Sequence, residues 1–295
     1  PVLTEGLPWT WESFPDYLDS LQGRRFDIDV CSQLPHAALR VYVMGQRGAD
    51  REPATEADIH AMAAIAKRAV EAGALGFSTS RTLNHRTSDG QPTPTLTAGE
   101  DELTGIALGL AAAGKGVLQV VSDFADPVAE FAMLRRIVER SGRPLSFSLA
   151  QGDRAPDGWR VLLAELSKAT ADGLPMKAQV AGRPVGVIFG LELTLNPFSH
   201  HPSYQAIAGR PLAERVAALS DPVFREQLLS EQPGPRAVLA GGMLNRWHKM
   251  HLMAETPDYE PLPENTVDRL AAQRGVRPEE VVLDHLLSRG GRGLI

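Results

Sequence analysis

The feature that most constrains the fold of this chain is a helix followed by a strand, a unit that occurs four times in succession. Apolar residues at helical spacing predict helices that begin near residues 55, 97, 126 and 157. Strands joined by such helices run parallel, and starts about 30 to 40 residues apart are typical of a (β/α) barrel. The sequence therefore predicts an α/β fold of the (β/α)8 TIM-barrel type, with strands expected at Ala74–Thr79, Val117–Val121, Leu145–Leu149 and Met176–Val180.

Local signals place the boundaries of several elements. Thr55 with Asp58, and Thr97 with Glu100, have the spacing of a capping box at a helix start. Proline in Asp126-Pro127 suits the first position of a helix. The run Leu39–Met44 is rich in apolar and β-branched residues, and we expect a short strand there.

The regular alternation stops at Arg183. From 183 to 263 the chain mixes small apolar residues, a polar and aromatic loop, and one or two helices over Leu212–Leu229. Excursions of this kind between barrel elements usually cover the active-site face, so we expect 183–263 to be an insertion or lid within one barrel domain spanning 1–295. A doubly wound open sheet is the alternative, and the lack of a Gly-x-Gly-x-x-Gly turn after any expected strand weighs against it.

Composition narrows the class of partner. Thirty Lys and Arg against 36 Asp and Glu give a net charge of −6, and no polybasic run is present. A nucleic acid or an anionic membrane surface is therefore a poor partner, and a small molecule is the better expectation. Cys31 is the only cysteine, which excludes an internal disulfide. With no apolar run of about 18 residues and no signal peptide, we expect a cytoplasmic location.

Polar side chains gather where the expected strands end, the edge at which α/β folds place their chemistry. Arginines there can pair with a carboxylate, and amides can bind a polar amide or a carboxylate. The alternative is that these groups only tie loops to backbone carbonyls. The candidates for substrate binding are Arg81, His85, Arg86, Gln119, Gln151, Gln179 and Arg183.

Two further histidines are weighed as substrate-binding residues. His36 follows a strand that we expect over Phe26–Cys31, and a proline precedes it directly. Its alternative is a structural histidine with satisfied hydrogen bonds. His200 and His201 are adjacent, so in an extended segment they point in opposite directions and only one faces a site. We assign that place to His201. No catalytic residue is assigned from the sequence.

Three segments of the chain resemble the N-acyl-D-amino-acid deacylase (D-aminoacylase) branch of the amidohydrolase superfamily, amidohydrolase family 3. They are Glu71–Arg86, Glu5–Glu12 and Pro35–Gly45. The resemblance implies a distorted (β/α)8 barrel that holds zinc, with a small β domain beside it. It also implies hydrolysis of an amide by a metal-bound hydroxide, with an aspartate on the last strand that moves the proton.

The chain departs from that pattern at the metal ligands. The family's His-x-His, its metal-binding cysteine and its aspartate would lie outside this chain, before Pro1 and after Ile295. Two more histidine ligands would fall in 117–123 and 145–151, and neither segment contains a histidine. We therefore expect zinc from the resemblance but no ligands for it here. The chain would be the central part of an incomplete barrel, without the flanking β domain, and inactive in isolation.

Two functions follow from these observations. The first is a hydrolase of linear amides other than peptide bonds, with N-acyl-D-amino acids as candidate substrates. The second is a catalytically silent barrel that binds a small carboxylate or amide through Arg81, His85 and the glutamines. The resemblance favours the first function, and the missing histidines favour the second.

Overall fold

The computed structural model of the chain describes residues 9–87, 90–152, 155–183, 185–234 and 243–295. It divides into two compact units, Pro1–Arg183 and Pro184–Ile295. Each unit has its own hydrophobic core. Residues 5–8 of the segment Glu5–Glu12 lie outside the described residues.

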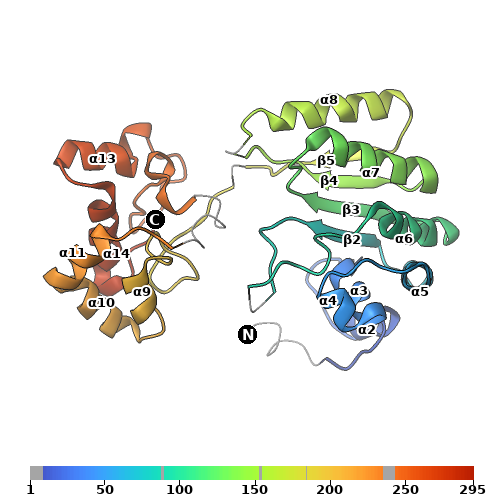
Figure 1. Cartoon of the computed structure of the whole chain (residues 1–295), viewed down its shortest axis with the longest axis horizontal. Coiled ribbons are helices and arrows are strands. Elements are labelled where there is room, and N and C mark those ends of the chain that lie inside the picture. The colour runs from blue at the N-terminus through green and yellow to red at the C-terminus, as the bar shows by residue number, and fades with distance from the viewer. Residues whose placement is uncertain (1–8, 88–89, 153–154, 184, 235–242) are drawn as a thin grey trace. The chain divides into compact units, whose positions relative to one another are not determined.

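The first unit is built on a parallel sheet (Figure 1). Every pairing between neighbouring strands is parallel, and the strands lie side by side in chain order. A doubly wound sheet requires a reversal of strand order, and none occurs among the described strands. The strands are β1 (Gln33–Pro35), β2 (Gly76–Arg81), β3 (Val117–Ser122), β4 (Leu145–Ser148) and β5 (Met176–Gln179).

The helices that connect these strands follow one another in the same order as the strands (Figure 1). Because crossovers between parallel strands are right-handed, an unreversed strand order places all of them on one face of the sheet. Their apolar faces and the sheet together form the core of the first unit. Consecutive parallel strands with their connecting helices on one face form part of a (β/α) barrel. The arrangement confirms the predicted α/β fold class. The connecting helices are α5 (Glu56–Glu71), α6 (Glu100–Ala112), α7 (Pro127–Ser141) and α8 (Gly158–Ala171).

Three of the four predicted helix starts are confirmed, including Asp157 as the N-cap of α8, and one is wrong. Thr55 and Asp58 form the expected capping box of α5, and the Asp126 side chain accepts from the Ala129 amide at the start of α7. Helix α6 begins two residues later than predicted, with Gly99 rather than Thr97 as its N-cap. Thr97 does not cap this helix, because its hydroxyl donates instead to the Arg51 carbonyl at 3.2 Å.

The strand expected at Leu39–Met44 is wrong, because these residues lie in helix α3 (His36–Met44). The β-branched residues suggested a strand, but the buried residues follow helical spacing, at i, i+3, i+4 and i+8: His36, Leu39, Arg40 and Met44. Tertiary contacts of Arg40, described below, also hold this segment. Helices α2 (Phe14–Gln22) and α4 (Gln46–Ala49) complete the first unit.

Helices α5 and α6 are in close contact because α6 has glycine at two positions one turn apart. A Cβ atom added at Gly109 would lie 2.3 Å from the Ala63 carbonyl oxygen, and one at Gly105 would lie 2.2 Å from Ile59 Cγ2. Glycine is therefore required at position 109, where the obstructing atom belongs to the backbone and cannot move aside.

The second unit is helical in its described parts. Its core includes residues of α13 and α14, beyond the range 183–263, and the C-terminal Ile295 exchanges two backbone hydrogen bonds with Phe189. The break at Asp221-Pro222 separates two helices, as predicted. The elements are α9 (Pro202–Ile207), α10 (Leu212–Ser220), α11 (Pro222–Ser230), α13 (Val267–Arg274), α14 (Pro278–Gly291) and the 3-10 turns η1 (Met243–Asn245), η2 (Trp247–Lys249) and η3 (Pro263–Asn265).

The role of 183–263 as an insertion or lid stays a prediction. Its start coincides with the boundary between the two units at Arg183. Part of the range, residue 184 and residues 235–242, lies outside the described residues. Among the helices of the described residues, none combines the length and the apolar character needed to cross a membrane.

The contact between α5 and α6 makes a testable prediction. We expect Gly109→Ala to lower the free energy of unfolding by about 1–3 kcal/mol, because the added methyl group forces the two helix backbones apart. Alanine favours a helix more than glycine does, so any loss reflects the contact rather than helix propensity.

The measurement is urea unfolding followed by circular dichroism. Leu108→Ala on the same helix is the control, because the Leu108 side chain is exposed and its removal should change stability by only about 0.5 kcal/mol. An unchanged or higher stability of Gly109→Ala would show that the two helices separate without cost.

Candidate functional site

The carboxyl edge of the sheet brings together residues from several strands, as expected for parallel strands. Alternation of side chains along a strand decides which of them point toward the helices and which toward the opposite face. In β2, Phe77 and Thr79 are buried on the helix side, so Arg81 shares their face. Ser78 and Ser80 project on the opposite face, which we call the open face of the sheet.

His36 belongs to a buried polar network on the helix side. Its Nδ1 lies 2.8 Å from Thr79 Oγ1, and its Nε2 lies 2.8 Å from Glu102 Oε1. Arg40 Nε donates to the same Glu102 oxygen at 2.9 Å. His36, Arg40 and Glu102 are each no more than 3% exposed. Both ring nitrogens of His36 are therefore occupied, the arrangement weighed above as its structural alternative.

The charges of this network compensate one another. Burial lowers the pKa of His36, although the hydrogen bond and the charge of Glu102 oppose that effect. Burial raises the pKa of Glu102, but its hydrogen bond to His36 and the charge of Arg40 outweigh burial and hold the pKa below its ordinary value. His36 is thus neutral, with its Nε2–H donating to an ionised Glu102 and its Nδ1 accepting from Thr79.

Arg40 also fixes the loops around the network. Its Nη1 donates to the Pro94 carbonyl at 2.8 Å and to the Gly48 carbonyl at 3.2 Å, and its Nη2 donates to the Glu52 carbonyl. Pro94 lies in the long loop between β2 and α6. The buried network therefore connects α3 and α4 to the loop that follows β2.

Arg81 is held by an internal carboxylate. Its Nε donates to Glu130 Oε1 at 2.6 Å, its Nη2 donates to Glu130 Oε2 at 3.3 Å, and its Nη1 donates to the Ala98 carbonyl. Ser122, opposite Arg81 on β3, donates to the same Glu130 at 2.9 Å. The sequence predicted carboxylate recognition by Arg81, and the structure shows that a glutamate of α7 occupies its guanidinium.

The loop after β2 holds His85 beside Ser80 on the open face. The Ser80 hydroxyl is hydrogen-bonded to His85 Nδ1. The Ser80 carbonyl accepts from the Thr95 hydroxyl at 2.6 Å, and the His85 carbonyl accepts from the Thr93 amide at 3.3 Å. His85 is exposed. The loop thus fixes the histidine ring through one nitrogen and leaves Nε2 toward solvent.

Asp123 anchors the start of the same loop. Its carboxylate accepts from the Thr82 hydroxyl at 2.5 Å and from the Leu83 amide at 2.8 Å. Arg86 is exposed and donates to the Gly90 carbonyl at 2.8 Å. Arg86 therefore ties the loop to itself, while part of its guanidinium faces solvent.

The three predicted glutamines do not behave alike. Gln119 Nε2 donates to Gln179 Oε1 at 3.3 Å, which brings β3 and β5 together on the open face. Gln151 is exposed, and its Nε2 donates to the Pro156 carbonyl at 3.1 Å within its own loop. Arg183, also exposed, ends the first unit. Gln119 and Gln179 thus form a pair on the open face, where Gln119 lies opposite Ser78 of β2. Gln151 belongs to a separate loop.

His201 lies in the second unit, immediately before α9. It is half-buried, its ring contacts Phe198, and its Nδ1 is buried without a hydrogen-bond partner in the described structure. Burial lowers the pKa of His201. Nearby, Ser203 donates its amide and its hydroxyl to Glu231. A substrate-binding role for His201 stays a prediction.

Sequence reasoning missed Ser80, Glu102 and Lys177. Ser80 has no distinctive sequence signal, yet its place in β2 directs it to the open face. Glu102 lies in an acidic first turn of α6, where a solvated carboxylate is the usual interpretation. Lys177 lies in β5 on the same face as Gln179, and the alternation of buried and exposed residues along that strand was the sequence signal that could have placed it there.

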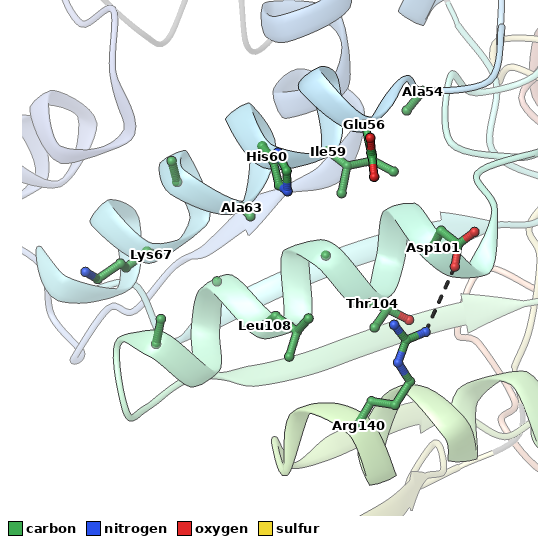
Figure 2. Close-up of a pocket in the computed structure, with 14 residues that line it drawn as sticks. Ala54, Glu56, Ile59, His60, Ala63, Lys67, Asp101, Thr104, Leu108 and Arg140 are labelled. Atoms are coloured by element: carbon green, nitrogen blue, oxygen red, sulfur yellow. Dashed lines mark ion pairs between the residues drawn. The ribbon is translucent and has the colours of Figure 1, made fainter.

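A hollow of about 680 Å³ lies among α5, α6 and α7 (Figure 2). Alanine and glycine residues of α5 and α6 line much of it, and Asp101 pairs with Arg140 across 4.0 Å at one side. None of the predicted site residues lines this hollow. It is therefore distinct from the polar groups at the strand ends.

The side chains on the open face of β3 and β4 do not fit a zinc ion. Zinc in proteins is held by thiolate, imidazole and carboxylate, and amides or hydroxyls bind it poorly. The open face of β3 and β4 presents the amide of Gln119, the hydroxyls of two serines and the apolar side chains of Val117 and Val121, and Cys31 is exposed elsewhere. Within the described part of the chain, no three His, Cys, Asp or Glu side chains are placed to hold a metal ion.

Comparison with known proteins gives consistent matches. A model of the amidohydrolase family matches residues 4–294. D-aminoacylase of Alcaligenes xylosoxydans xylosoxydans is 35% identical over 78 residues, covering 26% of this chain and 16% of that protein. An uncharacterised protein of Mycobacterium tuberculosis (strain ATCC 25618 / H37Rv) is 26% identical over 311 residues, covering 97% of this chain and 48% of that protein. The chain thus spans about half the length, or less, of the curated relatives it matches.

Among solved structures, the chain is similar to a D-aminoacylase described as having a binuclear metal centre. That match has a TM-score of 0.49 and 18% sequence identity, and it covers 96% of this chain and 46% of the other. A second D-aminoacylase structure gives the same TM-score at 22% identity, over 75% of this chain and 45% of the other.

The buried network predicts a pH dependence of stability. Below pH 6.5, the ordinary pKa of histidine, the unfolded chain takes up a proton at His36 that the folded chain does not bind. The contribution of neutral His36 to stability is therefore lost as the pH falls. We expect the difference in unfolding free energy between the wild type and His36→Gln to be largest near pH 7.5 and to shrink toward pH 5.

The measurement is urea unfolding of both proteins across this pH range. Taking the difference removes the titration of the shared groups that do not contact His36. A difference that stays constant, or that grows toward pH 5, would contradict a neutral His36 in the folded chain.

Proposed function

This chain belongs to the amidohydrolase family, and we propose that the protein hydrolyses carbon–nitrogen bonds of small linear amides other than peptide bonds. The family match over residues 4–294 is the observation that carries this proposal. As substrate we propose N-acyl amino acids, and their D forms first. The 78-residue match to D-aminoacylase, at 35% identity, supports that choice.

The substrate-binding residues that we propose lie on the open face of the sheet at its carboxyl edge. His85 offers Nε2 to the amide of the substrate, because its Nδ1 is held by Ser80. Gln119 and Gln179 each have further donor and acceptor capacity beyond the one bond that they share. These side chains bind and orient the amide.

The other residues predicted to bind substrate have secondary roles in this proposal. Arg86 and Arg183 are exposed cations beside the edge, and Gln151 lies in the loop after β4. Arg81 and His36 act indirectly, since Glu130 holds the first and the buried network holds the second. Their contribution is to fix the strand end and the loop that positions His85.

Metal dependence of the whole protein is a proposal that rests on the resemblance to D-aminoacylase. The described residues supply no ligand set for zinc, so no step of the reaction is assigned to a metal here. Other parts of the protein would have to supply its ligands. In this proposal the described residues bind the substrate, and the bond-breaking groups are left unassigned.

The alternative is a barrel that binds a small carboxylate or amide without hydrolysing it. The donor set at the ends of β3 and β4 favours this alternative, because hydroxyl and amide groups can bind such a ligand but do not activate water. Both functions share the same binding residues. Turnover of a bound amide is therefore the property that separates them.

The proposal predicts amide hydrolysis by the product of the complete open reading frame in which these residues lie. We expect release of free amino acid from N-acetyl-D-methionine, and comparison with the L form measures the stereochemical preference. His85→Ala should lower kcat/KM by about tenfold, because one hydrogen bond to the substrate is lost.

His60→Ala is the control, because His60 is an exposed histidine of α5 that we place outside the site. Saturable binding of N-acetyl-methionine without turnover, in the presence of added zinc, would favour the silent barrel. Equal activity of His85→Ala and the wild type would remove His85 from the site.

A further inference from the structure

We propose that the open face of the sheet contains a subsite for a small carboxylate, with Lys177 as its cation. The subsite would take the carboxylate of an N-acyl amino acid, and that substrate class rests on the proposed function. The binding chemistry itself, an ammonium with amide and hydroxyl groups around it, is independent of turnover.

The strand register brings the members of the subsite into line. Gln119 of β3 lies opposite Ser146 of β4, and Ser146 lies opposite Lys177 of β5. Ser148 lies opposite Gln179 in the same way. Since residues two apart on a strand share a face, Lys177 and Gln179 project from the same side of β5. One row of polar side chains therefore crosses three strands.

The long side chains of β3 and β5 can meet above β4, because the side chains of β4 between them are short. Strand β4 contributes only the short hydroxyl side chains of Ser146 and Ser148 on this face, between longer side chains on β3 and β5. The hydrogen bond from Gln119 to Gln179 shows that the β3 side chain reaches over β4 as far as β5. The flexible Lys177 side chain, two residues from Gln179, can therefore reach a ligand that is also bound by these amides.

The charge of Lys177 is available to a ligand. Lys177 is exposed and forms no ion pair with any residue that the structure describes. By contrast, Lys67 pairs with Glu71 and Lys168 pairs with Glu165. Arg81, which the sequence favoured for carboxylate recognition, is on the helix side and is held by Glu130. Lys177 is thus the cation that the strands of the described sheet present on the open face.

The side-chain groups of this row suit a small polar ligand better than a packed protein segment. A packed protein segment would require a mainly apolar surface, whereas on this part of the face Val117 and Val121 lie beside hydroxyls, amides and one ammonium. A small molecule with a carboxylate and an amide matches these groups, since the carboxylate pairs with Lys177 and the amide bonds to Gln119 or Gln179. An N-acyl amino acid has both groups a few bonds apart.

The test is calorimetric titration of the chain with N-acetyl-D-alanine and with N-acetyl-D-alaninamide, which lacks the carboxylate. We expect Lys177→Met to weaken binding of N-acetyl-D-alanine at least about fivefold and to leave binding of the amide analogue unchanged. Lys177→Arg should retain most of the affinity, because it keeps the charge.

Lys115→Met is the matched control, because Lys115 is also exposed without a recorded ion pair and lies in the turn before β3. Circular dichroism verifies that each variant is folded. Unchanged affinity in a folded Lys177→Met variant would overturn the proposal, and so would a lack of saturable binding by the wild type. A dimer that Lys177→Met converts to a monomer would also overturn it, because a second copy would then cover this face.

These outcomes separate the subsite from the proposed function. Carboxylate-dependent binding through Lys177 without hydrolysis by the complete protein would support the subsite and contradict the hydrolase. Hydrolysis of N-acetyl-D-alanine with equal KM in the wild type and Lys177→Met would support the hydrolase and contradict the subsite.

Discussion

The alternation of side chains along parallel strands is the constraint on which the first unit depends. One set of side chains, including Phe77, Leu118, Phe147 and Met176, is removed from water against the connecting helices, and this burial supplies the main driving force for the fold. The other set is then committed to the opposite face, where no hydrophobic cluster of the described residues forms. The alternation along the strands therefore determines both which side chains form the core and which lie at the candidate site.

The polar groups buried on the helix side lose their hydration, and hydrogen bonds and opposite charges within the protein replace it. Glu102 loses hydration there, and its negative charge is tolerated because Arg40 and His36 both donate to one of its oxygens. The same principle applies to Arg81, whose guanidinium is matched by Glu130. Such pairs contribute specificity to the packing of α3, α6 and α7 against the sheet. They also explain why His36 and Arg81, both predicted to bind substrate, are bonded to internal glutamates instead.

The open face has the opposite character, because its polar groups retain unused hydrogen-bonding capacity. Ser80 with His85, and Gln119 with Gln179, are each held by one bond and remain partly accessible. Groups that are fixed but not saturated can bind a polar ligand at little cost in conformational entropy. In the proposed function the ligand is an amide, and the residues on this face offer groups that can bind it rather than groups that cleave a bond.

The sequence by itself determined the repeated helix and strand units, the parallel sheet, the capping box at Thr55 and the start of α7 at Pro127, because these follow from local periodicity and capping chemistry. Its resemblance also led to the correct family. Only the tertiary structure decided that Leu39–Met44 is helical, that Thr97 bonds to Arg51, and which strand-end residues face the helices. The physical reason is that a local pattern identifies a polar side chain at a strand end. Whether that side chain serves the core or the site depends on partners such as Glu102 and Glu130, which lie 66 and 49 residues away in sequence.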